Sequence, residues 1–163
     1  SIFLVGSLYS LAQRSYGKGS EKAELSQNSR VAIERLSREL RQAADIVTAL
    51  PETESEPPAE EIFFQDGHNN SQITYLRHYL DGTNLIRQHK AYYFASEPDT
   101  YVIWNSRDQN GNPPSETEIS GQIVGEYFNG LEFWGMNGLI NISANLAKGQ
   151  SNVEITTSIY KRN

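Results

Sequence analysis

The sequence predicts an α+β fold in which one long N-terminal helix packs on an antiparallel β-sheet. Residues 14–50 are rich in the helix formers Glu, Lys, Ala, Leu, Gln and Arg, and no proline occurs before Pro51. Residues 62–160 contain short stretches of β-branched and aromatic residues separated by Gly, Asn and Pro. A helix followed by a run of antiparallel strands is an α+β arrangement, with the sheet covering the apolar side of the helix.

Length and composition indicate one globular unit with an appendage. A chain of 163 residues, 37% of them hydrophobic, is long enough for one domain with a core and short for two. We divide it into a helical stem, residues 1–24, and a globular head, residues 25–163. The sequence has no cysteine, which excludes disulfides, thiolate metal sites and a cysteine nucleophile.

The charge is unevenly distributed along the chain. Fourteen Lys and Arg against twenty Asp and Glu give a formal charge of -6, so we expect no direct nucleic-acid partner, which would require a basic face. Residues 14–45 hold seven basic and five acidic side chains, whereas the remainder from Ile46 onward holds seven basic and fifteen acidic ones. The N-terminal third is therefore basic and the body acidic.

Residues 1–12 (SIFLVGSLYSLA) form an uncharged, mostly apolar start. A membrane span needs about 20 apolar residues, so we interpret this segment as the end of a longer hydrophobic helix that begins upstream. The alternative is an apolar helix folded onto the core, although such helices usually have a polar side. The residues assigned to membrane and assembly contacts are Ile2, Phe3, Leu4, Val5, Leu8 and Leu11.

The helix is expected to continue to Leu50, with Gly17 and Gly19 as its weak points. Apolar residues recur at three- and four-residue spacing and predict one side packed on the sheet. The residues expected in this packing are Leu25, Ile33, Leu36, Leu40 and Val47. The other side is expected to pair its own charges at i,i+4 spacing, as Arg30–Glu34, Glu34–Arg38, Arg35–Glu39 and Arg41–Asp45, and a docking patch is the alternative.

The body is expected to follow an exposed acidic connector, residues 51–61 (PETESEPPAEE). Residues 73–80 and 85–90, joined by a turn at 81–84, give the strongest hairpin signal. The other strands are expected at residues 62–65, 92–95, 100–104, 130–134, 139–143 and 153–160.

Few residues are candidates for chemistry, and we expect no enzyme, no cofactor and no metal. His78 and His89 fall on opposite strands of the expected hairpin, where a surface cross-strand pair is favoured over a metal site. Asp108, Asn110 and Asn112 resemble the oxygen-ligand spacing of a calcium loop, but the match is incomplete and a plain turn is favoured. The tyrosines and tryptophans can line a sugar-binding surface, although aromatic residues in strands are more often packing residues.

Several segments together resemble the type IV pilin-like superfamily. They are the apolar start, the amphipathic segment ELSQNSRVAIERLSRELRQAADIV (residues 24–47), the strand ITY with its return LIRQ, and the terminal RN. The chain is most similar to minor pilins and pseudopilins of the W and J types. The resemblance implies a prepilin cleaved at the cytoplasmic face of the membrane, anchored by its N-terminal helix and then packed helix to helix into a filament.

The resemblance implies a structural subunit of a type IV pilus, a type II secretion filament or a DNA-uptake filament. Its partners would be other pilin or pseudopilin subunits and the membrane, and its location the bacterial cell envelope, extracytoplasmic once assembled. The alternative function is a cell-surface adhesin or ligand-binding module that uses an aromatic sheet face or the Asp108 loop.

Overall fold

The computed structural model describes residues 2–69 and 71–162, with the side chains of the helix described from Gly19 onward. This part contains one helix, α1 (Ile2–Arg41), and nine strands in two antiparallel sheets. The predicted fold class, α+β with a long helix packed on one antiparallel sheet, is therefore wrong. The protein is mostly β, and only a short stretch of α1, residues 19–41, has described packing.

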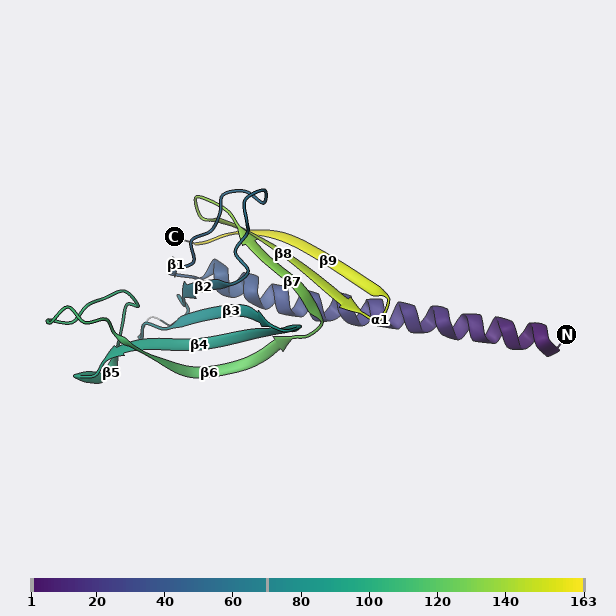
Figure 1. Cartoon of the computed structure of the whole chain (residues 1–163), viewed down its shortest axis with the longest axis horizontal. Helices are drawn as coiled ribbons and strands as arrows, with labels where there is room; N and C mark the ends of the chain where they lie inside the picture. The colour runs from purple at the N-terminus through teal and green to yellow at the C-terminus, as the bar shows by residue number, and fades with distance from the viewer. Residues whose placement is uncertain (1, 70, 163) are drawn as a thin grey trace.

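Six strands form the larger sheet (Figure 1). They are β1 (Asp45–Ile46), β2 (Ile62–Gln65), β3 (Tyr75–Asp81), β4 (Asn84–Phe94), β5 (Glu97–Val102) and β6 (Ser115–Gly125). The first five follow one another in the sheet in chain order, and β6 pairs with the long strand β4. The predicted hairpin is confirmed: β3 and β4 pair in register from Tyr75↔Lys90 to Asp81↔Asn84, and Gly82 takes the positive φ of 60° at the first turn position.

Three strands form the smaller sheet, in the order β7 (Phe128–Trp134), β8 (Leu139–Lys148) and β9 (Ser151–Tyr160). In Figure 1 the C-terminal part of α1 runs between the two sheets, and its N-terminal part extends beyond both. Side chains from all three layers share one core, including Leu36 of α1, Phe64 of β2 and Ile142 of β8. The helix therefore joins two sheets rather than lying on one.

The helix ends nine residues earlier than predicted, at Arg41 rather than Leu50. Beyond this point the backbone forms hydrogen bonds with the larger sheet: Ala44 N donates to Gln65 O (2.9 Å), and Asp45 pairs with Gln65. Gly67 lies so close to this corner that a Cβ there would be 1.8 Å from the carbonyl oxygen of Gln42. Such contacts between distant segments override the helix propensity of residues 42–50.

Strand β6 is missing from the sequence-based expectations: the expected turn covers residues 108–114, and none of the expected strands includes residues 115–125. It has few apolar residues, and eight of its eleven positions are exposed. An edge strand with little buried surface does not show the alternation of apolar and polar residues by which strands are recognised.

Candidate functional site

The N-terminal part of α1 extends beyond both sheets (Figure 1). The residues predicted for membrane and assembly contacts are Ile2, Phe3, Leu4, Val5, Leu8 and Leu11, and their side chains lie outside the described set. Within the described residues, no helix has both the length and the apolar character needed to cross a membrane. The proposed boundary between stem and head, at residues 24 and 25, falls inside this helix.

The core side of α1 is formed by the residues named for helix–sheet packing. Leu25, Ile33, Leu36 and Leu40 are all buried, and Leu36 is 0% exposed. The fifth residue, Val47, lies beyond the helix end and is half-buried, with its N–H bonded to Phe63 O (2.9 Å). It therefore packs as part of the connection to the larger sheet and not as a helix residue.

The opposite side of α1 borders a groove of about 680 Å³ against strand β9. Its charged lining consists of Arg30, Glu34, Arg38 and Arg41. Of the four predicted i,i+4 ion pairs, only Arg35–Glu39 forms among the described residues (3.6 Å). The prediction of a self-paired solvent side is therefore wrong for the other three pairs.

The far wall of the groove is the outer edge of β9, at Ile155, Thr156 and Thr157. In the sheet order β7–β8–β9, this strand has a described partner on one edge only, β8. An edge strand offers backbone N–H and C=O groups to an added strand or peptide. The groove thus combines arginine side chains with a row of backbone donors and acceptors.

A charged cluster lies on the core side of α1, between the helix and the larger sheet. Glu39 Oε1 accepts a hydrogen bond from Arg87 Nε (2.8 Å), and Glu39 Oε2 lies 3.2 Å from His78 Nε2. His78 is 1% exposed, and the Glu39 side chain is 16% exposed. The sequence pattern does not predict this cluster, because it assigns Glu39 to the solvent side of the helix. The partners of Glu39 are also about 40 or more residues away along the chain, so no local spacing indicates them.

Burial and charge act in opposite directions within this cluster. Burial lowers the pKa of His78, and the neighbouring Glu39 only partly offsets this effect, so the imidazole is held neutral. Burial alone would raise the pKa of Glu39, but His78 and Arg87 outweigh it and the net shift is downward. Glu39 is therefore an ionised acceptor that joins the helix to strands β3 and β4.

The histidines are placed differently from the prediction. His78 is buried, so the expected surface pair is wrong, and it stands opposite Arg87 while His89 stands opposite Leu76. Burial also lowers the pKa of His89. Among the described residues, no group of three or more His, Asp or Glu side chains is arranged to hold a metal ion.

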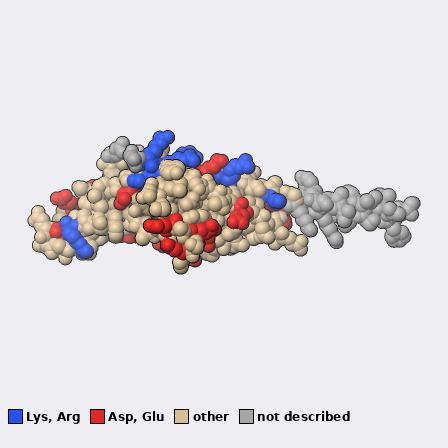
Figure 2. Space-filling view, turned by 90° about the horizontal axis from the view of Figure 1, so that it is seen from above, with Lys and Arg blue, Asp and Glu red and all other residues tan. Residues whose placement is uncertain are grey.

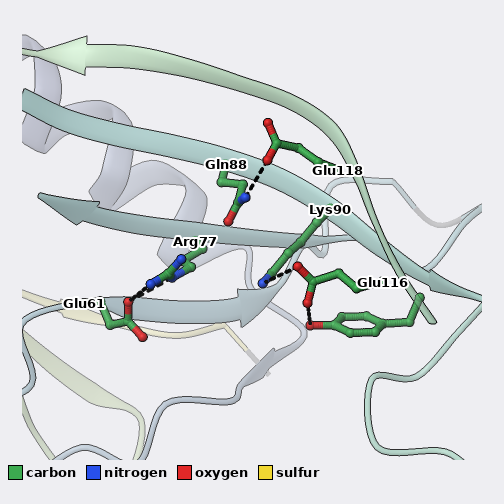
Figure 3. A network of polar contacts seen from close by, with 7 residues as sticks. Glu61, Arg77, Gln88, Lys90, Glu116 and Glu118 are labelled. Carbon is green, nitrogen blue, oxygen red and sulfur yellow. Dashed lines mark hydrogen bonds and ion pairs between the residues drawn. The ribbon is translucent and has the colours of Figure 1, made fainter. Parts of the chain in front are cut away.

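The outer face of the larger sheet carries a second polar network (Figure 3). Arg77 bonds to Glu61 through Nε (2.8 Å), and Gln88 Nε2 donates to Glu118 (2.6 Å). Glu116 accepts from both Lys90 Nζ (3.2 Å) and the Tyr92 hydroxyl (3.0 Å). On this face side chains thus link β3 to the residue before β2, and β4 to β6.

Aromatic rings accompany the network. Phe63, Tyr75 and Tyr92 pack together with ring centroids 5.2 to 6.5 Å apart, and Lys90 Nζ lies 4.7 Å from the centre of the Phe63 ring. Tyr75 is buried, and its hydroxyl accepts a hydrogen bond from Trp104 N (3.1 Å). This face is therefore largely occupied by contacts among its own side chains.

The Asp108 loop is stabilised by hydrogen bonds among its own residues. Asp108 Oδ1 accepts from the backbone N–H groups of Asn110 and Asn112 (both 2.8 Å), and Oδ2 accepts from Asn112 Nδ2 (3.0 Å). The hydrogen bonds from Asn112 lower the pKa of Asp108. These contacts make a side-chain-stabilised turn in which the Asn112 amide acts as a donor to the carboxylate.

The acidic connector, residues 51–61, is fastened to β7 near both ends. Gly135 N donates to Pro51 O (2.8 Å), and Ala59 exchanges two backbone bonds with Phe133 (2.8 and 3.1 Å). Between these points Glu52, Glu54 and Glu56 are exposed. On the face drawn in Figure 2, acidic side chains gather in the middle of the body, and the basic side chains lie mostly toward its borders with some acidic ones among them.

No family model, curated protein or solved structure matches the chain.

Proposed function

We propose that the chain is a structural, non-enzymatic subunit of an extracytoplasmic filament, of the minor pilin or pseudopilin kind that its sequence resembles. The observation that carries the proposal is the N-terminal part of α1, whose backbone extends beyond both sheets (Figure 1) and whose first twelve residues are uncharged. An apolar helix that leaves the body has little intramolecular surface to cover it. Membrane lipid before assembly and equivalent helices after assembly would supply that cover.

A ligand-binding module is the second candidate, and its one favourable observation is the aromatic outer face of the larger sheet. The polar groups of Arg77, Lys90 and Tyr92 on this face are already bonded to neighbouring glutamates. A ligand would have to break those contacts before forming its own, which reduces the net gain on binding. The filament proposal requires no such exchange.

The test replaces Leu4, Val5, Leu8 and Leu11 by Ser or Asn in the full-length protein in its native cell. We expect the variant to leave the membrane fraction and to be missing from the filament, because polar residues cannot replace apolar helix contacts. The matched control is Ile119→Ser with Ile123→Ser, which changes exposed apolar residues on the body. Recovery of the unmodified full-length protein in the soluble cytoplasmic fraction would overturn the proposal.

A further inference from the structure

We propose that the groove between α1 and β9 binds the acidic connector, residues 51–61, of a second copy of this chain. The inference builds on the proposed function, which places copies next to one another, and names the surfaces by which their bodies meet. The groove supplies arginines and a strand edge, and the connector supplies glutamates on an exposed segment.

The groove is suited to an acidic occupant. Arg30, Arg38 and Arg41 line it against a single acidic residue, Glu34. Throughout residues 19–69 and 71–162, none of these four side chains has an ion-pair partner within 4.0 Å. Guanidinium groups bind carboxylates with two parallel hydrogen bonds, and an extended segment beside them can also bond to the edge of β9.

The connector is suited to be that occupant. It contains five glutamates and no basic residue, and Glu52, Glu54 and Glu56 project between two attachments to β7. The two attachments, at Pro51 and Ala59, shorten the segment that must be ordered on binding, and this lowers the entropic cost. The number of exposed glutamates between them equals the number of groove arginines.

The placement of the two surfaces favours a second copy over a contact within one chain. The connector is fastened to β7 and the groove opens at β9, and these strands form opposite edges of the smaller sheet. Two strand spacings, about 10 Å, separate the edges across β8. When the groove of one copy binds the connector of another, the pair still has one free connector and one free groove. Further copies can therefore add in the same way, as a filament requires.

Disulfide trapping tests the contact directly, because the chain has no native cysteine. Full-length T156C and S55C proteins, carrying tags of different size, are mixed and oxidised. We expect a disulfide between the two proteins, and no comparable product from T156C with N105C, which changes an exposed residue that belongs neither to the groove lining nor to the connector. Trapping of T156C to itself in preference to S55C would overturn the proposal in favour of a symmetric pairing of two β9 edges.

A charge exchange sharpens the test. One variant carries Arg30→Glu, Arg38→Glu and Arg41→Glu, and the other carries Glu52→Lys, Glu54→Lys and Glu56→Lys. In each variant alone, groove and connector have the same charge, and trapping should fall about tenfold or more. Mixing the T156C form of the first with the S55C form of the second restores opposite charges and should restore trapping.

The controls separate this contact from folding and from the proposed function. Arg107→Glu and Glu97→Lys, both at exposed positions outside the groove lining and the connector, should leave trapping unchanged. Thermal melts of all variants should coincide, and trapping should weaken as salt rises because the pairs are exposed. Failure of the exchanged pair to recover overturns the inference even if filaments form, whereas trapping without filaments overturns only the proposed function.

Discussion

The two sides of α1 use similar sequence patterns with opposite consequences. Glu34 and Glu39 each have an arginine at i,i+4 spacing, yet Glu39 contacts Arg87 and His78 while Glu34 has no ion pair among the described residues. The difference lies in what the fold places opposite each side chain: two strands of the larger sheet for Glu39, and an open groove for Glu34. Spacing along a helix identifies possible pairs, and the tertiary surroundings select among them.

The comparison implies that the core side determines stability and the groove side determines contacts with other molecules. The core side combines leucines with no exposed surface and one buried charged cluster. The groove side carries exposed arginines, whose individual effects on folding are expected to be small. Four substitutions and one acid titration, in order of decreasing effect, test this division.

The largest effect is expected from Leu36→Ala. Leu36 is 0% exposed, and its truncation should lower the free energy of unfolding by about 2–5 kcal/mol through lost burial and the cavity left behind. Denaturant unfolding measures the change. Val31→Ala is the matched control on the same helix: Val31 is 61% exposed, and its change should stay within about 0.5 kcal/mol. Equal costs at both positions would contradict the assignment of the core side.

Glu39→Gln should have the next largest effect. The amide keeps the shape of the carboxylate but loses the charge that faces Arg87 and His78, so we expect a loss of about 1–3 kcal/mol. Glu34→Gln, the matched change on the groove side, should alter the unfolding free energy by less than about 0.5 kcal/mol. A larger loss from Glu34→Gln than from Glu39→Gln would reverse the comparison.

Acid should destabilise the protein in two stages. The pKa of His78 is lowered in the folded state, so the unfolded chain takes up a proton first, and stability should fall as pH drops below about 6.5. The pKa of Glu39 is also lowered, so a further loss should follow below about 4.5. Unfolding measured from pH 8 down to about pH 2 checks both stages.

His78→Gln should reduce the first stage of this pH dependence and leave a remainder from His89, whose pKa is also lowered. Stability that rises between pH 7 and pH 5 would show that the buried imidazole is not held neutral.

The smallest effect on stability is expected from Arg38→Ala. Its side chain is exposed in the groove, so the unfolding free energy should change by less than about 0.5 kcal/mol. Any effect should appear instead in the trapping of a second copy. A destabilisation of several kcal/mol would mean that the arginine belongs to the folding core, and the two sides of α1 would no longer be distinct.

Local patterns in the sequence were sufficient for the hairpin and for the apolar side of the helix. The hairpin turn is recognisable because Gly82, which can adopt a positive φ, occupies the first position of a two-residue turn, Gly82–Thr83, between two strand-like segments. The stripe through Leu25, Leu36 and Leu40 is recognisable because helical spacing places these residues on one side. Both signals involve residues only a few positions apart, where geometry follows directly from the order of residues.

The sequence by itself thus determined a helix with an apolar side, a β-rich body and an uneven charge. Tertiary structure alone decided that the strands divide into two sheets around α1, that the helix ends at Arg41, and that exposed β6 becomes a strand by pairing with β4. It also brought Glu39 to His78 and left the groove arginines beside the edge of β9. These outcomes depend on contacts between residues far apart in the chain, whose pairing is set by the packing of the whole molecule and not by local spacing.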